Sequence, residues 1–204
     1  MLSFDLALAL AATVLALALR PWRAVTDLPW PALALWAALP LLWSVDRLSA
    51  MPVMQPLAGS CLLLMMLGWP LAVLSLVPIA ALGAWLGGIA WPQALDHLAW
   101  NGIVTATLAL AIGLATRRWL PRHPFVFLLG RGFLVTALAT VLAGALSALV
   151  SPLPPGSELG SILLGHWLMA WGEAFATGML VAIFVAFKPE WLATWSDARY
   201  LTDA

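Results

Sequence analysis

The sequence predicts an all-α polytopic membrane protein: a bundle of about seven transmembrane helices, with the N-terminus outside and the C-terminus in the cytoplasm. Three observations support this prediction. Hydrophobic residues make up 64% of the 204 residues and charged residues only 9%, too few to cover the surface of a soluble domain. The apolar residues form runs of roughly membrane-spanning length. The basic residues fall almost entirely in alternate connections between those runs.

The domain prediction is a single transmembrane bundle over residues 1–187, followed by a polar cytoplasmic tail over 188–204. Composition excludes several function classes. The net charge is zero and no basic patch indicates nucleic acid. A lone cysteine, Cys61, allows neither an intrachain disulfide nor a CxxC metal motif. The chain lacks a GxxxxGK[ST] phosphate loop, and it has no nucleophile beside a base. The sequence therefore predicts neither an ATPase of that type nor another enzyme.

The first predicted span covers residues 3–19 and is followed by Arg20 and Arg23. A secretory signal carries its basic residues before the apolar core, so this segment is predicted to be retained as a span. Its C-terminal end is then cytoplasmic, and Asp5 is expected near the outer interface.

Proline and glycine interrupt the next three apolar runs. Residues 30–44 are short for a span and contain two prolines. Two further prolines and Gly59 in the run 50–67 predict irregular or re-entrant backbone, which a membrane tolerates only against protein or a cavity. A tight turn at 68–70 is predicted to separate this run from the fourth span, 70–90.

Polar connections separate the last three predicted spans. These spans are residues 99–116, 125–150 and 161–187, and the loop 151–160 joins the last two. His97 is expected to be solvated in the connection before the fifth span.

The distribution of basic residues orients this arrangement. With seven spans, the connections after spans 1, 3, 5 and 7 lie on one side, and the opposite connections hold Arg47 alone. Merging 50–90 into a single span would place the arginine-rich loops on opposite sides, so the seven-span arrangement is preferred. The basic residues on the predicted cytoplasmic side are Arg20, Arg23, Arg117, Arg118, Arg122, Lys188 and Arg199.

The thirteen tryptophans mostly lie near the ends of the apolar runs, where indole rings anchor a protein at the lipid headgroups. An aromatic cage for a substrate is the alternative interpretation. The tryptophans at run ends are Trp22, Trp43, Trp69, Trp91, Trp100, Trp119, Trp191 and Trp195.

The last predicted span carries a polar stripe. At about 100° per residue, His166, Glu173 and Thr177 fall within roughly 20° of one helix face. Ionisable groups in a membrane span are costly and face a bundle interior or cavity. Three roles remain open: a structural polar network, direct contact with a substrate, or coupling to a partner subunit or proton relay. Asn101 and Arg131 are the candidate partners on other helices.

The stripe belongs to a longer pattern: Gly165-His166, five residues ending in Gly172, Glu173, three residues, then Thr177. This pattern resembles the last segment of the cobalt/nickel-type substrate-capture permeases of energy-coupling-factor transporters. Asn101 resembles an asparagine that this family places in its fifth span. The resemblance implies about seven spans in a bacterial inner membrane, a small solute bound from outside, and partners on separate chains. Those partners would be a transmembrane coupling protein and cytoplasmic ATPase subunits.

The chain departs from this family at the residues that bind the metal. The family uses a free N-terminal amine and a histidine as second residue, whereas this chain begins Met1-Leu2-Ser3. A family Ser-Gly-His stretch corresponds here to 59–61, which ends in Cys61, or alternatively aligns at Pro56. Nickel and cobalt favour imidazole ligands, so neither metal is carried over by resemblance alone.

Sulfur-containing residues crowd the segment where the family has that histidine. Met54, Cys61 and Met65 form a speculative soft-metal site, since thiolate and thioether sulfur suit Cu(I). Packing is the alternative, because methionine is a common gap-filler. No resident cofactor is predicted, and a transition-metal ion is considered only as substrate. A non-transporting membrane scaffold or assembly protein that has lost the metal site is the second functional hypothesis.

Overall fold

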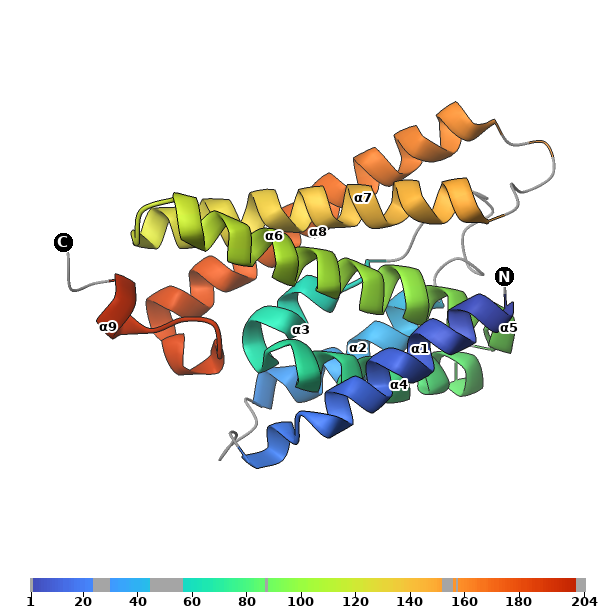
Figure 1. Cartoon of the computed structure of the whole chain (residues 1–204), viewed down its shortest axis with the longest axis horizontal. Coiled ribbons are helices and arrows are strands. Elements are labelled where there is room, and N and C mark those ends of the chain that lie inside the picture. The colour runs from blue at the N-terminus through green and yellow to red at the C-terminus, as the bar shows by residue number, and fades with distance from the viewer. Residues whose placement is uncertain are drawn as a thin grey trace.

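The computed structural model describes residues 2–23, 30–44, 57–86, 88–151, 156 and 158–200. All regular secondary structure in these ranges is helical, which confirms the predicted all-α class. The helices lie along one long axis, with the start of α1 and the C-terminal α9 at opposite ends of the molecule (Figure 1).

The helices correspond closely to the predicted apolar runs, with two of them containing π-helical turns. The first four are α1 (Leu2–Ala18), α2 (Trp30–Trp43), α3 (Ser60–Leu67) and α4 (Trp69–Leu86). They are followed by α5 (Trp91–Asp96), the π-helical η3 (His97–Val104), α6 (Thr105–Trp119), the π-helical η4 (Val126–Leu134), α7 (Val135–Val150) and α8 (Leu159–Phe187). Short 3₁₀ turns at Pro21–Arg23 and Pro189–Trp191 and the four-residue α9 (Asp197–Tyr200) complete the described elements.

Four helices in the described part of the chain are long and apolar enough to cross a membrane. They are Trp69–Leu86, Trp91–Trp119, Val126–Val150 and Leu159–Phe187. The apolar helices α1 and α2 are shorter, at 17 and 14 residues.

The helix Trp91–Trp119 begins well before the predicted start at residue 99. The expectation that His97 lies solvated in a connection was therefore wrong. His97 lies inside η3, is only 6% exposed, and packs edge-on against the Trp43 ring. The helix continues through the polar residues at 96–101, of which His97 is buried in the bundle and Asp96 and Asn101 are half-buried.

Helix α3 is a half-length helix enclosed by the bundle. All eight of its residues are buried, against α2, α4, α6 and α8. Its N-terminus follows Gly59, whose φ of +64° is left-handed, and a Cβ there would come within 2.5 Å of Leu39 Cδ2. The predicted irregular backbone is confirmed for 57–59, and the earlier part of that prediction, including Met54, lies outside the described residues.

The predicted turn after α3 is also confirmed. Gly68, with φ +76°, is the single residue between α3 and α4. Because a left-handed residue ends a helix sharply, the chain reverses direction without a loop.

The segment after α8 packs back onto the bundle. The amides of Ala193 and Thr194 donate to the carbonyls of Met66 and Met65, at 3.1 and 3.2 Å. The Thr194 hydroxyl also donates to the Met65 carbonyl, at 3.0 Å. These bonds satisfy carbonyl groups at the C-terminal end of α3, which a helix cannot satisfy by itself. The tail is thus part of the packing around α3.

Six of the tryptophans at run ends lie at the two extremes of exposure, and Trp69 and Trp191 are half-buried. Trp22, Trp91 and Trp119 are 55%, 67% and 82% exposed, in agreement with a role as interface anchors. For three others the predicted anchoring was wrong, because Trp43, Trp100 and Trp195 are at most 9% exposed. Their indole N–H groups donate to Ala58, Asp5 and Asp197 respectively. Buried indoles fill the bundle core and find polar partners there.

Candidate functional site

The carboxylate of Glu173 is the polar centre of the bundle. Glu173 lies midway along α8 and is 2% exposed. Its oxygens accept hydrogen bonds from two consecutive backbone amides, Ala58 N at 2.9 Å and Gly59 N at 2.7 Å. These amides directly precede α3, so the carboxylate also meets the positive end of that helix dipole. Glu173 thereby holds the irregular segment in front of α3 against α8.

This pairing corrects one sequence-based expectation. Asn101 and Arg131 were the candidate partners for His166 and Glu173 on other helices, but the structure gives Glu173 main-chain donors instead. Arg131 points elsewhere: its guanidinium packs beside Gly113 of α6, and its Cζ lies 5.5 Å from the centre of the Phe127 ring.

Glu173 and Asn101 nevertheless line the same cavity. The cavity has a volume of about 10 Å³, room for one water-sized group. Asn101 reaches it from the π-helical η3, a type of helix distortion that is frequent at functional sites. Its lining residues are Leu57, Ala58, Asn101, Thr105, Thr140, Met169 and Glu173.

The polar groups around this cavity are oxygens and one amide. The Thr105 hydroxyl donates to the Trp100 carbonyl at 2.9 Å. The Thr140 hydroxyl is buried and makes no hydrogen bond within the described residues. A carboxylate, an amide and hydroxyls can orient a small polar solute or contribute oxygen ligands to a cation. In this conformation the cavity is too small for a hydrated ion.

The other two residues of the stripe flank the cavity without lining it. His166 and Thr177 are 7% and 2% exposed, so the whole predicted face of α8 is buried. His166 packs directly on Gly144 of α7, where a Cβ would overlap the imidazole. Gly144 therefore provides the space in which the histidine lies. The stripe thus makes two described contacts, His166 on α7 and Glu173 on the segment before α3.

The speculative sulfur site is less well supplied with ligands. Cys61 and Met65, one turn apart on α3, line a second cavity of about 10 Å³ together with Arg131 and Thr136. An arginine in the same cavity opposes a cation there. In the ranges that the structure describes, no group of three or more His, Cys, Asp or Glu residues is placed to hold a metal ion.

Sequence reasoning missed a second buried carboxylate. Asp5, in the first turn of α1, is 3% exposed and accepts a hydrogen bond from Trp100 Nε1 at 3.2 Å. This contact ties α1 to η3, the segment that carries Asn101. An aspartate inside an apolar run signals a buried partner, and the sequence did not show which residue that partner is.

One comparison with known proteins decides the family. The family model of the cobalt uptake substrate-specific transmembrane region, CbiM, matches residues 4–191. The chain belongs to the CbiM family. The match runs from the first turn of α1 to Trp191, so it extends the resemblance seen in the sequence back through the first two helices. No curated protein and no solved structure matches the chain.

Membership in the CbiM family confirms the suspected resemblance and gives the chain its broad role. CbiM proteins are membrane components of cobalt uptake and not enzymes, and they work with other transporter components. Together with four apolar helices of spanning length, the family makes this chain a multi-pass membrane protein.

Proposed function

We propose that this chain is the substrate-capture subunit of an energy-coupling-factor transporter in a bacterial inner membrane, and that its substrate is a transition-metal ion. The CbiM match over residues 4–191 is the observation that carries the proposal. The absence of a phosphate loop from the sequence supports a division of labour, in which separate ATPase subunits and a transmembrane coupling protein supply the energy.

The proposed topology has seven spans, with the N-terminus outside and a cytoplasmic tail over 188–204. Two features support it. The start of α1 and the short α9 lie at opposite ends of the molecule, as an odd number of crossings requires (Figure 1). The α6–η4 connection, which contains Arg122, lies at the same end as α9, so the basic residues there would face the cytoplasm.

The site residues carry different roles in this proposal. Asn101 and Glu173 border the polar cavity and would contact the solute or its path. Glu173 additionally positions residues 57–59, because it holds the Ala58 and Gly59 amides. His166 and Thr177 would keep α8 in register with α7. A substrate ion would reach the cavity only after α3 or α8 moves, since the present volume is about 10 Å³.

Metal uptake by the assembled transporter tests the proposal. The chain would be expressed, with its coupling protein and ATPase subunits, in cells that lack their own cobalt and nickel uptake systems. Accumulated cobalt, nickel and copper are measured by mass spectrometry of washed cells. We expect at least one of these metals to accumulate, and its accumulation to depend on the ATPase activity. Parallel E173Q and N101L cells separate folding from transport, because membrane abundance of each variant is measured alongside uptake.

A non-transporting scaffold or assembly protein is the second candidate. It is favoured by the lack of a clustered His, Cys, Asp or Glu ligand set in the described residues. Under this alternative no metal accumulates above the level of cells without the chain, although the protein reaches the membrane at normal abundance. That outcome, together with no metal retained on purified protein and on its C61A variant, would reject metal uptake.

A further inference from the structure

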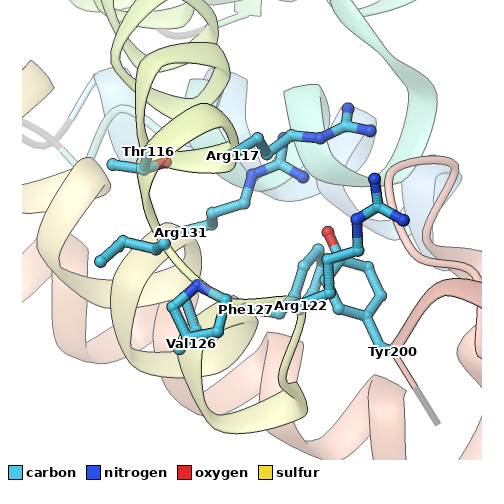
Figure 2. Close-up of a pocket in the computed structure, with 9 residues that line it drawn as sticks. Thr116, Arg117, Arg122, Val126, Phe127, Arg131 and Tyr200 are labelled. Carbon is cyan, nitrogen blue, oxygen red and sulfur yellow. The ribbon is translucent and has the colours of Figure 1, made fainter. Parts of the chain in front are cut away.

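A larger cavity than the one beside Glu173 lies at the end of the molecule where the α6–η4 connection and α9 meet. It has a volume of about 110 Å³ and is formed by the end of α6, the start of η4 and Tyr200 of α9. Three arginines line it: Arg117, Arg122 and Arg131. Figure 2 shows these arginines around the cavity, together with Phe127 and Tyr200.

Within the described residues, these positive charges have no acidic partner: no carboxylate forms an ion pair with any of the three arginines. The described salt bridge joins Lys188 to Glu190, and Asp197 accepts the Trp195 indole N–H. Arg131 Nη1 is buried and has no hydrogen-bond partner in the described ranges. An anion between the three guanidinium groups would offset their mutual repulsion, and no carboxylate in the described ranges does so.

The position of the cavity relative to the membrane indicates the source of the anion. It opens where one span, Trp91–Trp119, ends and the next, Val126–Val150, begins. Exposed apolar side chains flank it: Trp119 at 82%, Leu120 at 45% and Phe125 at 61%. An exposed tryptophan at the end of a span lies at headgroup depth. A basic cavity bordered by exposed apolar residues at that depth matches both parts of a phospholipid, its phosphate and its acyl chains.

We propose that Arg117, Arg122 and Arg131 form a binding site for the phosphate group of an anionic phospholipid. Guanidinium groups bind phosphate oxygens through paired, charge-assisted hydrogen bonds. The Arg131 side chain is already held in place without a ligand, because it packs against Gly113 and over the Phe127 ring. Arg117 and Arg122 are exposed and complete the site from either side of the α6–η4 connection. The proposal does not depend on which solute the protein carries.

Lipid retention on the purified full chain tests this site. The protein in non-ionic detergent is titrated with phosphatidylglycerol or phosphatidylcholine, and bound lipid is counted by native mass spectrometry. Preferential retention of phosphatidylglycerol is expected. R117Q and R122Q should each lower that retention roughly fivefold, and together about twentyfold. Both side chains are exposed, so the variants should fold, which size-exclusion chromatography and circular dichroism check.

Arg118 provides a matched control. It is exposed, adjacent to Arg117 and carries the same charge, but it does not line the cavity. R118Q should retain phosphatidylglycerol within about twofold of the parent protein, whereas nonspecific attraction would make its loss equal to that of R117Q. Equal losses, or equal retention of phosphatidylcholine, would overturn the proposal.

Two further measurements test whether the cavity binds an anion other than a lipid. Glycerol 3-phosphate and inorganic phosphate are added as competitors, and neither should displace the lipid at low millimolar concentration. Displacement by either would assign the cavity to a free phosphate compound instead of a lipid. Unchanged lipid retention in the R117Q/R122Q double variant, with loss of binding to other transporter subunits, would assign it to an acidic protein surface. Either result contradicts a lipid site.

Discussion

The carboxylate of Glu173 accepts the backbone amide of Gly59 at 2.7 Å, across 114 positions of sequence. The second oxygen of Glu173 accepts the amide of Ala58 at 2.9 Å. Both oxygens of a buried membrane carboxylate are thus satisfied by main chain. The contact holds residues 57–59, the irregular backbone that precedes the buried half-helix α3. Glu173 is therefore a positioning residue for α3.

Glu173→Leu should lower the free energy of unfolding by about 2–5 kcal/mol, because two buried amides lose their acceptor. Glu173→Gln should cost about 1–3 kcal/mol, since its side-chain NH₂ would face one of these donors. Unfolding by SDS in mixed micelles measures both. Glu190→Gln is the control: Glu190 is 60% exposed in its ion pair, and the change should be within about 0.5 kcal/mol. A Glu173→Leu variant as stable as the parent would show that the carboxylate does not hold the segment before α3.

Gly144→Ala should destabilise the protein by about 1–3 kcal/mol, because the added methyl overlaps the His166 imidazole. In a His166→Ala background the same change should be neutral or stabilising, as alanine favours helix over glycine. The double-mutant cycle, measured by the same SDS titration, should therefore show coupling of at least about 0.5 kcal/mol. Gly172→Ala on the exposed face of α8 meets no neighbour and should not destabilise the protein. Additive effects at 144 and 166 would mean that the two residues do not share a packing site.

Trp195→Ala should lower stability by about 3–5 kcal/mol. The indole packs on Phe127 and Tyr200, each with ring centres 4.8 Å away, and donates to Asp197 at 2.6 Å. Trp119→Ala removes an equally large side chain that is 82% exposed, and should change stability by less than about 0.5 kcal/mol. Melting temperature in detergent compares the two variants. Similar values for both would show that the docked tail does not contribute to the fold.

Cysteine labelling tests the proposed topology. The native Cys61 is 1% exposed and should react with a maleimide only after denaturation. In a Cys61→Ala background, E158C should react with a membrane-impermeant maleimide on intact cells. H123C, at an exposed position in the opposite loop, should react only after the cells are broken open. Labelling of H123C but not E158C on intact cells would show the opposite orientation. Labelling of both positions on intact cells would exclude an odd number of crossings between residues 123 and 158.

The sequence by itself determined which segments must be buried and which helix faces must be shielded. Apolar length predicted the spans, and the spacing of His166, Glu173 and Thr177 predicted one buried face of α8, because both follow from local helix geometry. Glycine and proline likewise predicted the irregular backbone before α3 and the turn that follows it at Gly68. The pattern around Glu173 also identified the family that the CbiM match confirmed.

Only the tertiary structure decided the partners. The donors to Glu173 are backbone amides, which every residue except proline carries, so no residue type could mark Ala58 and Gly59 in advance. His97, Asp5 and Trp100 look like interface or loop residues in the sequence, but contacts across the bundle bury them. The three arginines of the basic cavity come together with Tyr200 only because residues 192–195 dock on α3 and bring α9 to Phe127. Helix periodicity is local and can be read from the chain, whereas these contacts join residues far apart in sequence, which only packing brings together.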